Sequence, residues 1–507
     1  MLSLLVIDQK FARWYEFQGD TAMYYQSLQS IDRSGVPLSN IGASSVWIHT
    51  YQPARLTPAQ LAVAPLPPSP ISELNLLEWH SYFILYPIAA LTLIFPAPPI
   101  LVGIYVLSFT GALLFAYLLI RSRGVPVAAA LVYCVLLMTY IPWSQGLTGQ
   151  FYPDRIFVLA GLGFMYVVSV RRSPVWLQIA LGLACASITE RGALVAGIAA
   201  IAFAASSWRA LEQRRFRLGL GIALLAISFA EFHSLINTEN GHYMAASLRQ
   251  LARWFSNPVF AGETVSFVVV NLPLLLLALF DRRRAAVALL LMLPNVFGSI
   301  NGNEKIGWTT SYHSYYMPAL ILASASGFAL AYERARTAMH RNAVLAATAA
   351  LALFTAMLDP YAFPRIDVSF GNIGSSFIPQ LVPAVKTVGS QPGYAADYAA
   401  IRKAVPRGSL VTAVEPAMPI LYRDRNLQFY PLGLDRAGYA VLSPATEPDG
   451  THNLFGGFAT FANEQKRADA ALLARMRKDG YDVDHPLVFD SVGLVVVKHS
   501  KMMLRDL

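Results

Sequence analysis

The sequence predicts an α-helical polytopic membrane bundle followed by a C-terminal external α/β domain. The chain has 507 residues, of which 55% are hydrophobic and only 14% are charged. Its mean hydropathy is +0.46, which is far from the balance of a soluble globular chain. Apolar runs that approach the length needed to cross a hydrocarbon core of about 30 Å recur over the first 360 residues. After residue 385 the composition changes to that of a soluble α/β unit.

Ten apolar segments are the predicted membrane helices, and several of them are short for a span. They are 98–120, 125–141, 155–170, 175–189, 192–206, 217–235, 265–280, 285–299, 313–332 and 342–358. The start, "MLSLLVID", is typical of the end of an incomplete eleventh helix, because it lacks the basic region and cleavage site of a signal peptide. Residues 81–95 do not fit as a crossing. They predict a helix in the outer interface, with "PAPP" as the turn that follows.

The basic residues alternate between the loops. Fourteen arginines occupy alternate loops: Arg121, Arg123, Arg171, Arg172, Arg209, Arg214, Arg215, Arg217, Arg282, Arg283, Arg284, Arg334, Arg336 and Arg341. The intervening loops hold Arg155, Arg191, Arg249, Arg253 and Lys305. An excess of Lys and Arg marks cytoplasmic loops, so we predict a multi-pass inner-membrane protein whose C-terminal domain is external, or periplasmic.

The net charge of +9 is therefore a topology signal. A nucleic-acid partner would need these residues gathered on one face or tail, so membrane lipid is the expected partner and nucleic acid is not. Both cysteines, Cys134 and Cys185, fall in apolar runs, which argues against a disulfide framework. No oligomeric state follows from the sequence.

The predicted organisation is a membrane domain over 1–360 that includes a first external loop at 18–97, a linker at 361–384 and the external domain at 385–507. In that domain "DYAAIRKAV" predicts a helix, "SLVTAV" and "YAVLS" predict strands, and "MPILYRDRNLQFYPL" predicts a helical turn and a strand. "EQKRADAALLARMRKDGY" predicts a helix that ends at Gly480, and "PLVFDSVGLVVVKH" predicts a hairpin. The domain carries no phosphate loop, metal-spaced Cys/His set or nucleophile motif, so it is either a recognition module or a structural lid.

Ionisable residues gather in the predicted outer loops. Six segments supply them: Asp20; His80; Asp154 and Arg155; Glu190 and Arg191; Glu231 and His233; and Glu304 and Lys305 with Tyr312 and His313. If the helices form one bundle, these groups converge at the outer membrane face.

Structural interpretations stay open for each of them. Asp20 can cap the helix that follows it. Asp154 can interact favourably with the positive, N-terminal end of the next helix. Either histidine can be a hydrogen-bonded structural residue. Glu190 and Arg191 can form a salt bridge at a turn, worth under about 1 kcal/mol if exposed. No two histidines share i, i+4 spacing with a carboxylate, so no metal site is predicted.

Several stretches together resemble a known family. They are "GDTAMYYQSL", "WHSYFILYPIAALTLIFP", "TER", "YHSYYMPALI" and "AVPRGSLVTAVEPAMPILYRDRNLQFYPLG". In this order they resemble a bacterial family of predicted polytopic membrane proteins of unknown function, which is similar in layout to the GT-C glycosyltransferases. The resemblance covers about 15–360 and 395–445.

The resemblance implies a GT-C-like fold and a glycosyltransferase-like activity that uses a polyprenyl-phosphate sugar donor on the outer membrane face. Asp20 matches the acidic residue of the first external loop that lies at the reaction centre of GT-C enzymes, and Asp154 matches a second acidic residue in the next loop. The chain lacks an Asp-X-Asp pair, so a divalent metal cofactor stays open without a clear ligand motif.

The expected mechanism is direct displacement at the anomeric carbon, with Asp20 as general base. Arg191, with Arg155 or Lys305, is expected to bind the lipid phosphate, since the planar guanidinium donates two hydrogen bonds at once. Other substrate contacts are expected from Glu190, which orients Arg191, from Tyr312 and His313, and from the aromatic stretch 79–86 with His80 at the lipid entrance.

The alternative class is a non-enzymatic membrane transporter or a scaffold for lipid-linked or envelope components. Charged groups that face a cavity serve transport equally well. The sequence shows no inverted repeat of the kind that transporters carry, and ionisable groups confined to one face favour the transferase.

Overall fold

The computed structural model of the chain describes residues 19–44, 73–95, 97–148, 151–170, 172–206, 211–235, 258–298, 303–306, 308, 311–358, 392–414, 417–423, 426–446, 452–455, 472–489 and 493–500. They divide between two compact units. A helical unit takes the described residues of Leu77–Pro87 and Pro99–Val385. A mixed unit takes those of Asp8–Leu76, Ile88–Pro98 and Lys386–Leu507.

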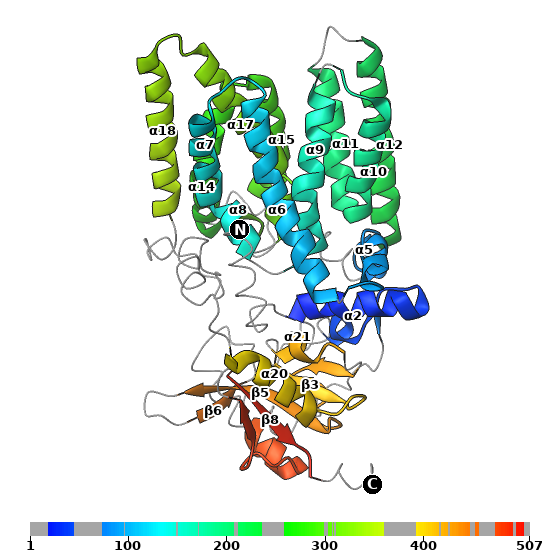
Figure 1. Ribbon diagram of the computed structural model, residues 1–507. Coiled ribbons are helices and arrows are strands. Elements are labelled where there is room, and N and C mark those ends of the chain that lie inside the picture. Colours follow the sequence, from blue (N-terminus) through cyan, green and yellow to red (C-terminus); the bar gives the residue numbers. More distant parts are fainter. Residues whose placement is uncertain are drawn as a thin grey trace. The chain divides into compact units, whose positions relative to one another are not determined.

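The helical unit consists of apolar helices that run side by side (Figure 1). Its elements are α6 (Ala97–Arg121), α7 (Val127–Thr139), α8 (Ile141–Thr148), η3 (Pro153–Ile156), α9 (Phe157–Ser169), α10 (Val175–Ile188), α11 (Glu190–Ala205), α12 (Leu211–Leu235), α14 (Pro258–Ala278), α15 (Arg282–Phe297), α16 (Asn303–Ile306), η5 (Ser311–Ser314), α17 (Met317–Arg334) and α18 (Ala338–Met357). Helix α17 lies at the core of this unit, since every residue from Met317 to Ala329 is buried.

Several helices of this unit turn large apolar side chains outward. Leu107, Leu114 and Leu118 of α6 are each more than half exposed, and Ile222 and Phe229 of α12 are more exposed still. Soluble monomers rarely leave so large an apolar surface in contact with water. The distribution is typical of helices that face lipid.

Two helices of the described part are long and apolar enough to cross a membrane, Pro99–Arg121 and Gln213–Leu235. A third candidate is the pair Val127–Thr139 and Ile141–Leu147, which is bent by 69° at Tyr140. The other predicted segments form helices too, but α9, α10 and α11 have 13, 14 and 16 residues, and a straight span needs about 20. The structure therefore indicates a membrane protein with two or three candidate spans, while the full count of ten or eleven crossings stays a prediction.

The Arg-rich loops are those that hold the fourteen arginines, and the contacts of four of their described arginines lie at one end of the helical unit. Their contacts with neighbouring helix ends are Arg123 with Glu333 (3.5 Å), Arg217 Nη2 with the Val170 carbonyl oxygen (2.6 Å), Arg283 Nε with Ser206 Oγ (2.7 Å) and Arg284 Nε with Ser169 Oγ (3.3 Å). Because α9 ends and α12 and α15 begin here, the turn between α10 and α11 lies at the opposite end. The alternation of arginine-rich and arginine-poor loops along the sequence thus corresponds to the two ends of one unit.

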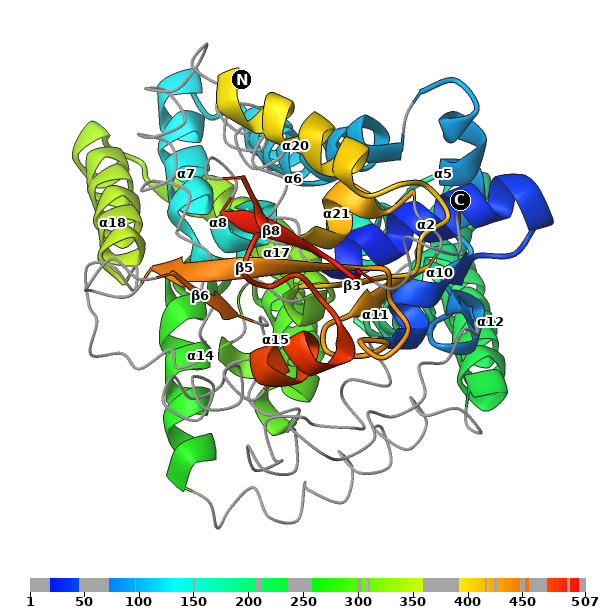
Figure 2. The same ribbon diagram turned by 90° about the horizontal axis from the view of Figure 1, so that it is seen from below.

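The mixed unit contains a six-stranded sheet. Its elements are α2 (Gly19–Ser34), β1 (Leu38–Ser39), β2 (Leu74–Asn75), α20 (Pro392–Ala404), β3 (Val411–Ala413), α21 (Met418–Leu421), β4 (Leu427–Phe429), β5 (Tyr439–Thr446), β6 (His452–Phe455), β7 (Leu487–Phe489) and β8 (Leu494–Lys498). The strand order is β4-β3-β5-β8-β7, and β6 also pairs with β5. Strand β3 is parallel to β4 and β5, whereas β8 is antiparallel to β5 and β7. Figure 2 shows β5 as the long strand of this sheet.

The predicted elements of this domain are confirmed within its described residues. The helix, the strands, the helical turn and the C-terminal hairpin correspond to α20, β3, α21, β4, β5, β7 and β8. The predicted last helix is described over 472–479 and ends at Gly480, whose φ of 102° suits a glycine. Strand β6 was not predicted, and the predicted linker 361–384 lies outside the described residues.

The N-terminal segment packs with the C-terminal domain inside the mixed unit. Gln26 Oε1 accepts hydrogen bonds from Ser39 Oγ (2.8 Å) and the Ile41 amide (3.2 Å). Ser44 Oγ accepts one from the Phe429 amide at 3.0 Å. The stretch predicted as an external loop of the membrane domain therefore contributes structure to the same compact unit as residues after Lys386.

Two local expectations need correction. The "PAPP" stretch is not a turn as a whole, because α6 already begins at Ala97; proline is well suited to a first helical turn, where its missing N–H costs nothing. Asp20 does not precede its helix as a cap, because α2 begins at Gly19. The predicted interfacial helix is α5 (Leu85–Thr92), which follows the short helix η2 (Leu76–Glu78).

Candidate functional site

The turn between α10 and α11 is one residue long. Thr189 is extended, with φ −162° and ψ 165°, and its side chain accepts a hydrogen bond from the Gly192 amide at 3.1 Å, so it caps α11. A Cβ at residue 192 would overlap the Cys185 carbonyl oxygen, which explains why glycine stands there. This turn places Glu190 and Arg191 as the first two residues of α11.

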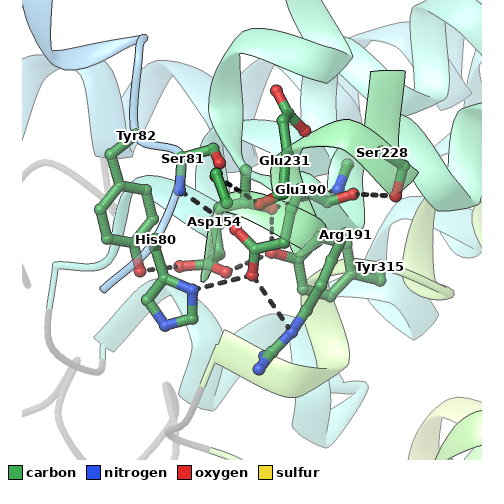
Figure 3. A network of polar contacts seen from close by, with 12 residues as sticks. His80, Ser81, Tyr82, Asp154, Glu190, Arg191, Ser228, Glu231 and Tyr315 are labelled. Carbon is green, nitrogen blue, oxygen red and sulfur yellow. Dashed lines mark hydrogen bonds and ion pairs between the residues drawn. The ribbon is translucent and has the colours of Figure 1, made fainter. Parts of the chain in front are cut away.

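The Glu190 carboxylate is fully buried rather than solvated at a surface turn. His80 Nδ1 lies 2.8 Å from Glu190 Oε1, the Ser81 amide donates to Oε2 at 3.2 Å, and Arg191 Nε lies 3.8 Å from Oε1. Ser228 Oγ donates to the Glu190 backbone carbonyl at 2.8 Å. In Figure 3 His80 and Arg191 approach the carboxylate from two sides. The sequence allowed Glu190 and Arg191 to form a salt bridge at a turn, and the structure contains this ion pair. Glu190 is buried and not exposed, because the one-residue turn directs it inward.

These partners keep Glu190 ionised. Burial raises the pKa of Glu190, but His80 and Arg191 outweigh it, and the pKa falls from 4.5 to about 2. The N-terminal end of α11 adds a favourable dipole for an anion at this position. The buried carboxylate is thus a fixed negative charge with a full set of donors.

Asp154 forms a second anchored carboxylate beside the first. It is 2% exposed and accepts a hydrogen bond from Tyr82 at 3.1 Å and another from the Tyr315 hydroxyl. The Tyr315 hydroxyl also lies 2.7 Å from Thr189 Oγ1, which connects Asp154 to the cap of α11. We define the acidic network by the residues joined in this way: His80, Ser81, Tyr82, Asp154, Thr189, Glu190, Arg191, Ser228 and Tyr315.

Arg191 and His80 are the members of the acidic network that reach its surface. Their side chains are 22% and 14% exposed. The Arg191 guanidinium lies 5.4 Å from the centre of the Tyr312 ring, at the distance of a cation–π contact. Burial raises the pKa of Tyr312, and the Arg191 charge only partly opposes that rise. The structure therefore brings five predicted site residues together: His80, Asp154, Glu190, Arg191 and Tyr312.

Arg155 points elsewhere. It is 1% exposed, its Nη1 donates to the Gly146 carbonyl oxygen, and its guanidinium lies 5.6 Å and 5.9 Å from the Tyr105 and Tyr152 ring centres. A guanidinium held by a carbonyl and aromatic rings stabilises the fold around η3. A role for Arg155 in phosphate binding stays a prediction.

Lys305 and His313 belong to a separate buried group, the lysine cluster, defined by Glu304, Lys305, Trp308, His313 and Tyr316. Lys305 Nζ lies 2.6 Å from Glu304 Oε1 and also donates to the Gly298 carbonyl. His313 Nδ1 lies 3.0 Å from the Tyr316 hydroxyl, and its ring centre lies 4.6 Å from that of Trp308. Asn295 joins this cluster to Tyr312, the residue against which Arg191 packs, because its Nδ2 donates to the backbone carbonyls of Glu304 (2.6 Å) and Tyr312 (3.4 Å).

Asp20 lies in the first turn of α2, in the mixed unit. Its side chain is outside the described residues, so its predicted role as general base stays a prediction. Among the described residues no group of three or more His, Cys, Asp or Glu side chains is arranged to hold a metal ion.

The sequence did not predict that tyrosine hydroxyls would be the donors to Asp154 in the network. Tyr82 follows His80 by two residues and Tyr315 follows His313 by two, so both stand in stretches that were singled out, but neither pattern predicts that the two hydroxyls meet at Asp154. Glu231, one turn along α12 from Ser228, lies beside the network in Figure 3. Its Oε2 is buried and has no hydrogen-bond partner within the described part of the chain.

Comparison with known proteins adds no family. No protein-family model matches the chain, and no curated protein matches it. The resemblance drawn from the sequence stretches therefore stays a prediction, and any function rests on the geometry of the site.

Proposed function

We propose that the chain is an integral membrane protein that transfers a sugar from a polyprenyl-phosphate donor, in the manner of a GT-C glycosyltransferase. The observation that carries the proposal is the acidic network. Two buried carboxylates are fixed there beside a guanidinium and an imidazole that both reach the surface. This set combines a phosphate ligand, fixed negative charge and a group able to exchange protons.

Arg191 is the proposed ligand of the donor phosphate. Its planar fork matches two phosphate oxygens, and as the sugar leaves, it neutralises the charge that develops on the phosphate. Glu190 holds the guanidinium from behind, with Arg191 Nε 3.8 Å from its Oε1. Tyr312 supports the guanidinium through its ring face.

Asp154 is the proposed counter-charge for the sugar. Direct displacement at an anomeric carbon passes through an oxocarbenium-like transition state, which a fixed carboxylate stabilises without reorganisation. Both oxygens of Asp154 are held by tyrosine hydroxyls. Its position is therefore set before substrate arrives.

The proposal also includes the membrane arrangement. We place the Arg-rich loops in the cytoplasm and the acidic network at the outer face of the inner membrane, with ten or eleven crossings and an external C-terminal domain. The excess of arginine at one end of the helical unit supports this orientation.

The test is transfer of a radiolabelled sugar from a polyprenyl-phosphate donor by the purified chain in lipid vesicles. Replacement of Arg191 with Ala removes the phosphate ligand and is expected to lower the rate about 10- to 100-fold, as the loss of a hydrogen bond to a charged group predicts. Arg123→Ala is the matched control, because Arg123 contacts Glu333 at the other end of the unit. Wild-type rates for Arg191→Ala would remove Arg191 from the site. If the lipid-linked sugar moved across the vesicle membrane and no sugar were transferred, the result would support a transporter and not a transferase.

A further inference from the structure

Five exposed arginines lie at the end of the helical unit where the Arg-rich loops make their contacts. They are Arg172, Arg215, Arg282, Arg334 and Arg336. Each lies one to three residues along the chain from a group whose contacts define this end. Within the described part of the chain none of the five has a hydrogen bond or an ion pair. We call these residues the arginine surface.

The protein does little to compensate the charge of the arginine surface. The described carboxylates at this end are Glu333, which lies 3.5 Å from Arg123, and Asp281, which lies 2.8 Å from Arg284. Both are thus already paired with other arginines. Arg282 is also the first residue of α15, where the helix dipole disfavours a positive charge. The charge of these side chains is therefore available to an external anion.

Lipid headgroups are the anions that this end meets. Both helices of the described part that are long enough to cross a membrane terminate here, because Pro99–Arg121 ends and Gln213–Leu235 begins at this end. In Figure 1 these two helix ends lie at the top of the helical unit. A span ends where the hydrocarbon core gives way to the headgroups. The arginine surface therefore lies at the level of the lipid phosphates.

Exposed apolar side chains beside two of these arginines support the same placement. Trp176 follows Arg172 by four residues and is 68% exposed, and Met339 follows Arg336 by three residues and is 73% exposed. Tryptophan is enriched where a membrane meets water, because one part of its ring system is apolar and its N–H is polar. At such a boundary the guanidinium groups meet phosphates and the apolar side chains meet acyl chains.

We infer that the arginine surface binds the headgroups of anionic phospholipids and selects them over zwitterionic ones. Guanidinium groups donate charge-assisted hydrogen bonds to phosphate oxygens. The summed positive charge favours a lipid with net negative charge. This inference does not rest on the proposed transferase function, because the arginine surface lies at the opposite end of the helical unit from the α10–α11 turn.

The test measures the lipid selectivity of the full chain in phosphatidylcholine vesicles that contain a trace of spin-labelled phosphatidylglycerol or spin-labelled phosphatidylcholine. Electron spin resonance separates labelled lipid that is immobilised at the protein from lipid that moves freely. One arginine near an anionic surface corresponds to about a 5-fold preference. We expect wild type to favour phosphatidylglycerol by about 2- to 5-fold, because lipid sites elsewhere on the protein dilute the effect.

The variant that combines Arg215→Gln, Arg282→Gln and Arg336→Gln is expected to lose most of this preference. Its unfolding temperature should remain that of wild type, because the three side chains have no partner within the described residues. If the variant selects phosphatidylglycerol as strongly as wild type does, the inference is wrong.

A matched control removes the same charge from the mixed unit. Lys403→Gln, Arg407→Gln and Lys478→Gln change three exposed side chains there, and this combination should keep the full preference. Loss of the preference in the control would mean that net charge alone, and not the arginine surface, selects the lipid.

Salt tests the inference on wild type without any substitution. Between about 0.1 M and about 1 M salt the Debye length falls from about 10 Å to about 3 Å, so the preference for phosphatidylglycerol should shrink toward equal immobilisation of the two lipids. Equal immobilisation already at low salt, or a preference that does not respond to salt, would overturn the inference.

Discussion

Two groups of buried charge in the helical unit use similar residues but differ in access. The acidic network holds Glu190 at 0% exposure yet opens through Arg191 and His80, at 22% and 14%. In the lysine cluster, Lys305 and Glu304 are 0% and 4% exposed, and each satisfies the other. A charge that is fully paired inside the protein has nothing left to offer a ligand. The comparison indicates that the acidic network serves binding and that the lysine cluster serves the fold.

The largest expected effect is the loss of stability when the buried ion pair of Glu304 and Lys305 is broken. Lys305→Ala leaves the Glu304 carboxylate buried without its ammonium, a change that costs about 3–5 kcal/mol. Thermal unfolding in detergent, followed by intrinsic fluorescence, should show a clearly lower transition temperature.

Replacement of both members, with Glu304→Met and Lys305→Met, should recover most of that loss because no unpaired charge remains. A lysine cluster that binds substrate would behave in the opposite way. Lys305→Ala would then keep its unfolding temperature and lose transfer activity, which would remove the distinction between the two groups.

The next effect tests how tightly the acidic network is anchored. Tyr315→Phe removes the hydroxyl that Asp154 and Thr189 share, and a hydrogen bond to a charged group is worth about 1.5–3 kcal/mol. Tyr82→Phe removes a single bond of 3.1 Å and should cost less. Equal unfolding temperatures for Tyr315→Phe and wild type would mean that the hydrogen bond from Tyr315 to Asp154 does not contribute to stability.

A comparable effect is expected at the turn that places Glu190. Gly192→Ala brings a methyl group onto the Cys185 carbonyl, and overpacking of this kind costs about 1–3 kcal/mol. Gly103→Ala is the matched control, since its added Cβ meets nothing within 4 Å beyond its chain neighbours and the backbone of its own helix. The two variants should separate in thermal stability, and equal stability would show that α10 and α11 can move apart freely.

The sequence predicts the parts of the fold that depend on local pattern. Apolar segments, the Arg-rich loops and the strands of the C-terminal domain all follow from composition and periodicity. Burial of Glu190 does not, because a dipeptide between two apolar runs fits a surface turn equally well. The contact of Tyr315 with Asp154 joins residues 161 apart, and one sequence carries no signal for such a pairing. The packing of Gln26 and Ser44 in the mixed unit was missed for the same reason.

The last prediction concerns the protonation of Glu190, which changes stability only in acid and not at neutral pH. Its pKa is lowered from 4.5 to about 2, so the stability that it contributes is fully present above pH 4.5. That stability is lost as the pH falls from 4.5 toward 2, because the carboxylate must then be protonated. The difference in unfolding temperature between wild type and Glu190→Gln should narrow over this range. A difference in unfolding temperature that stays constant with pH would mean that the charge of Glu190 does not contribute to stability.

The most direct test of the central claim is equilibrium binding of a polyprenyl phosphate to the chain in lipid nanodiscs. The claim is that Arg191, at the open edge of the acidic network, binds the lipid phosphate. The account predicts that Arg191→Ala weakens binding about 10-fold or more, while Arg123→Ala binds as wild type does. Equal affinity for wild type and Arg191→Ala would contradict it.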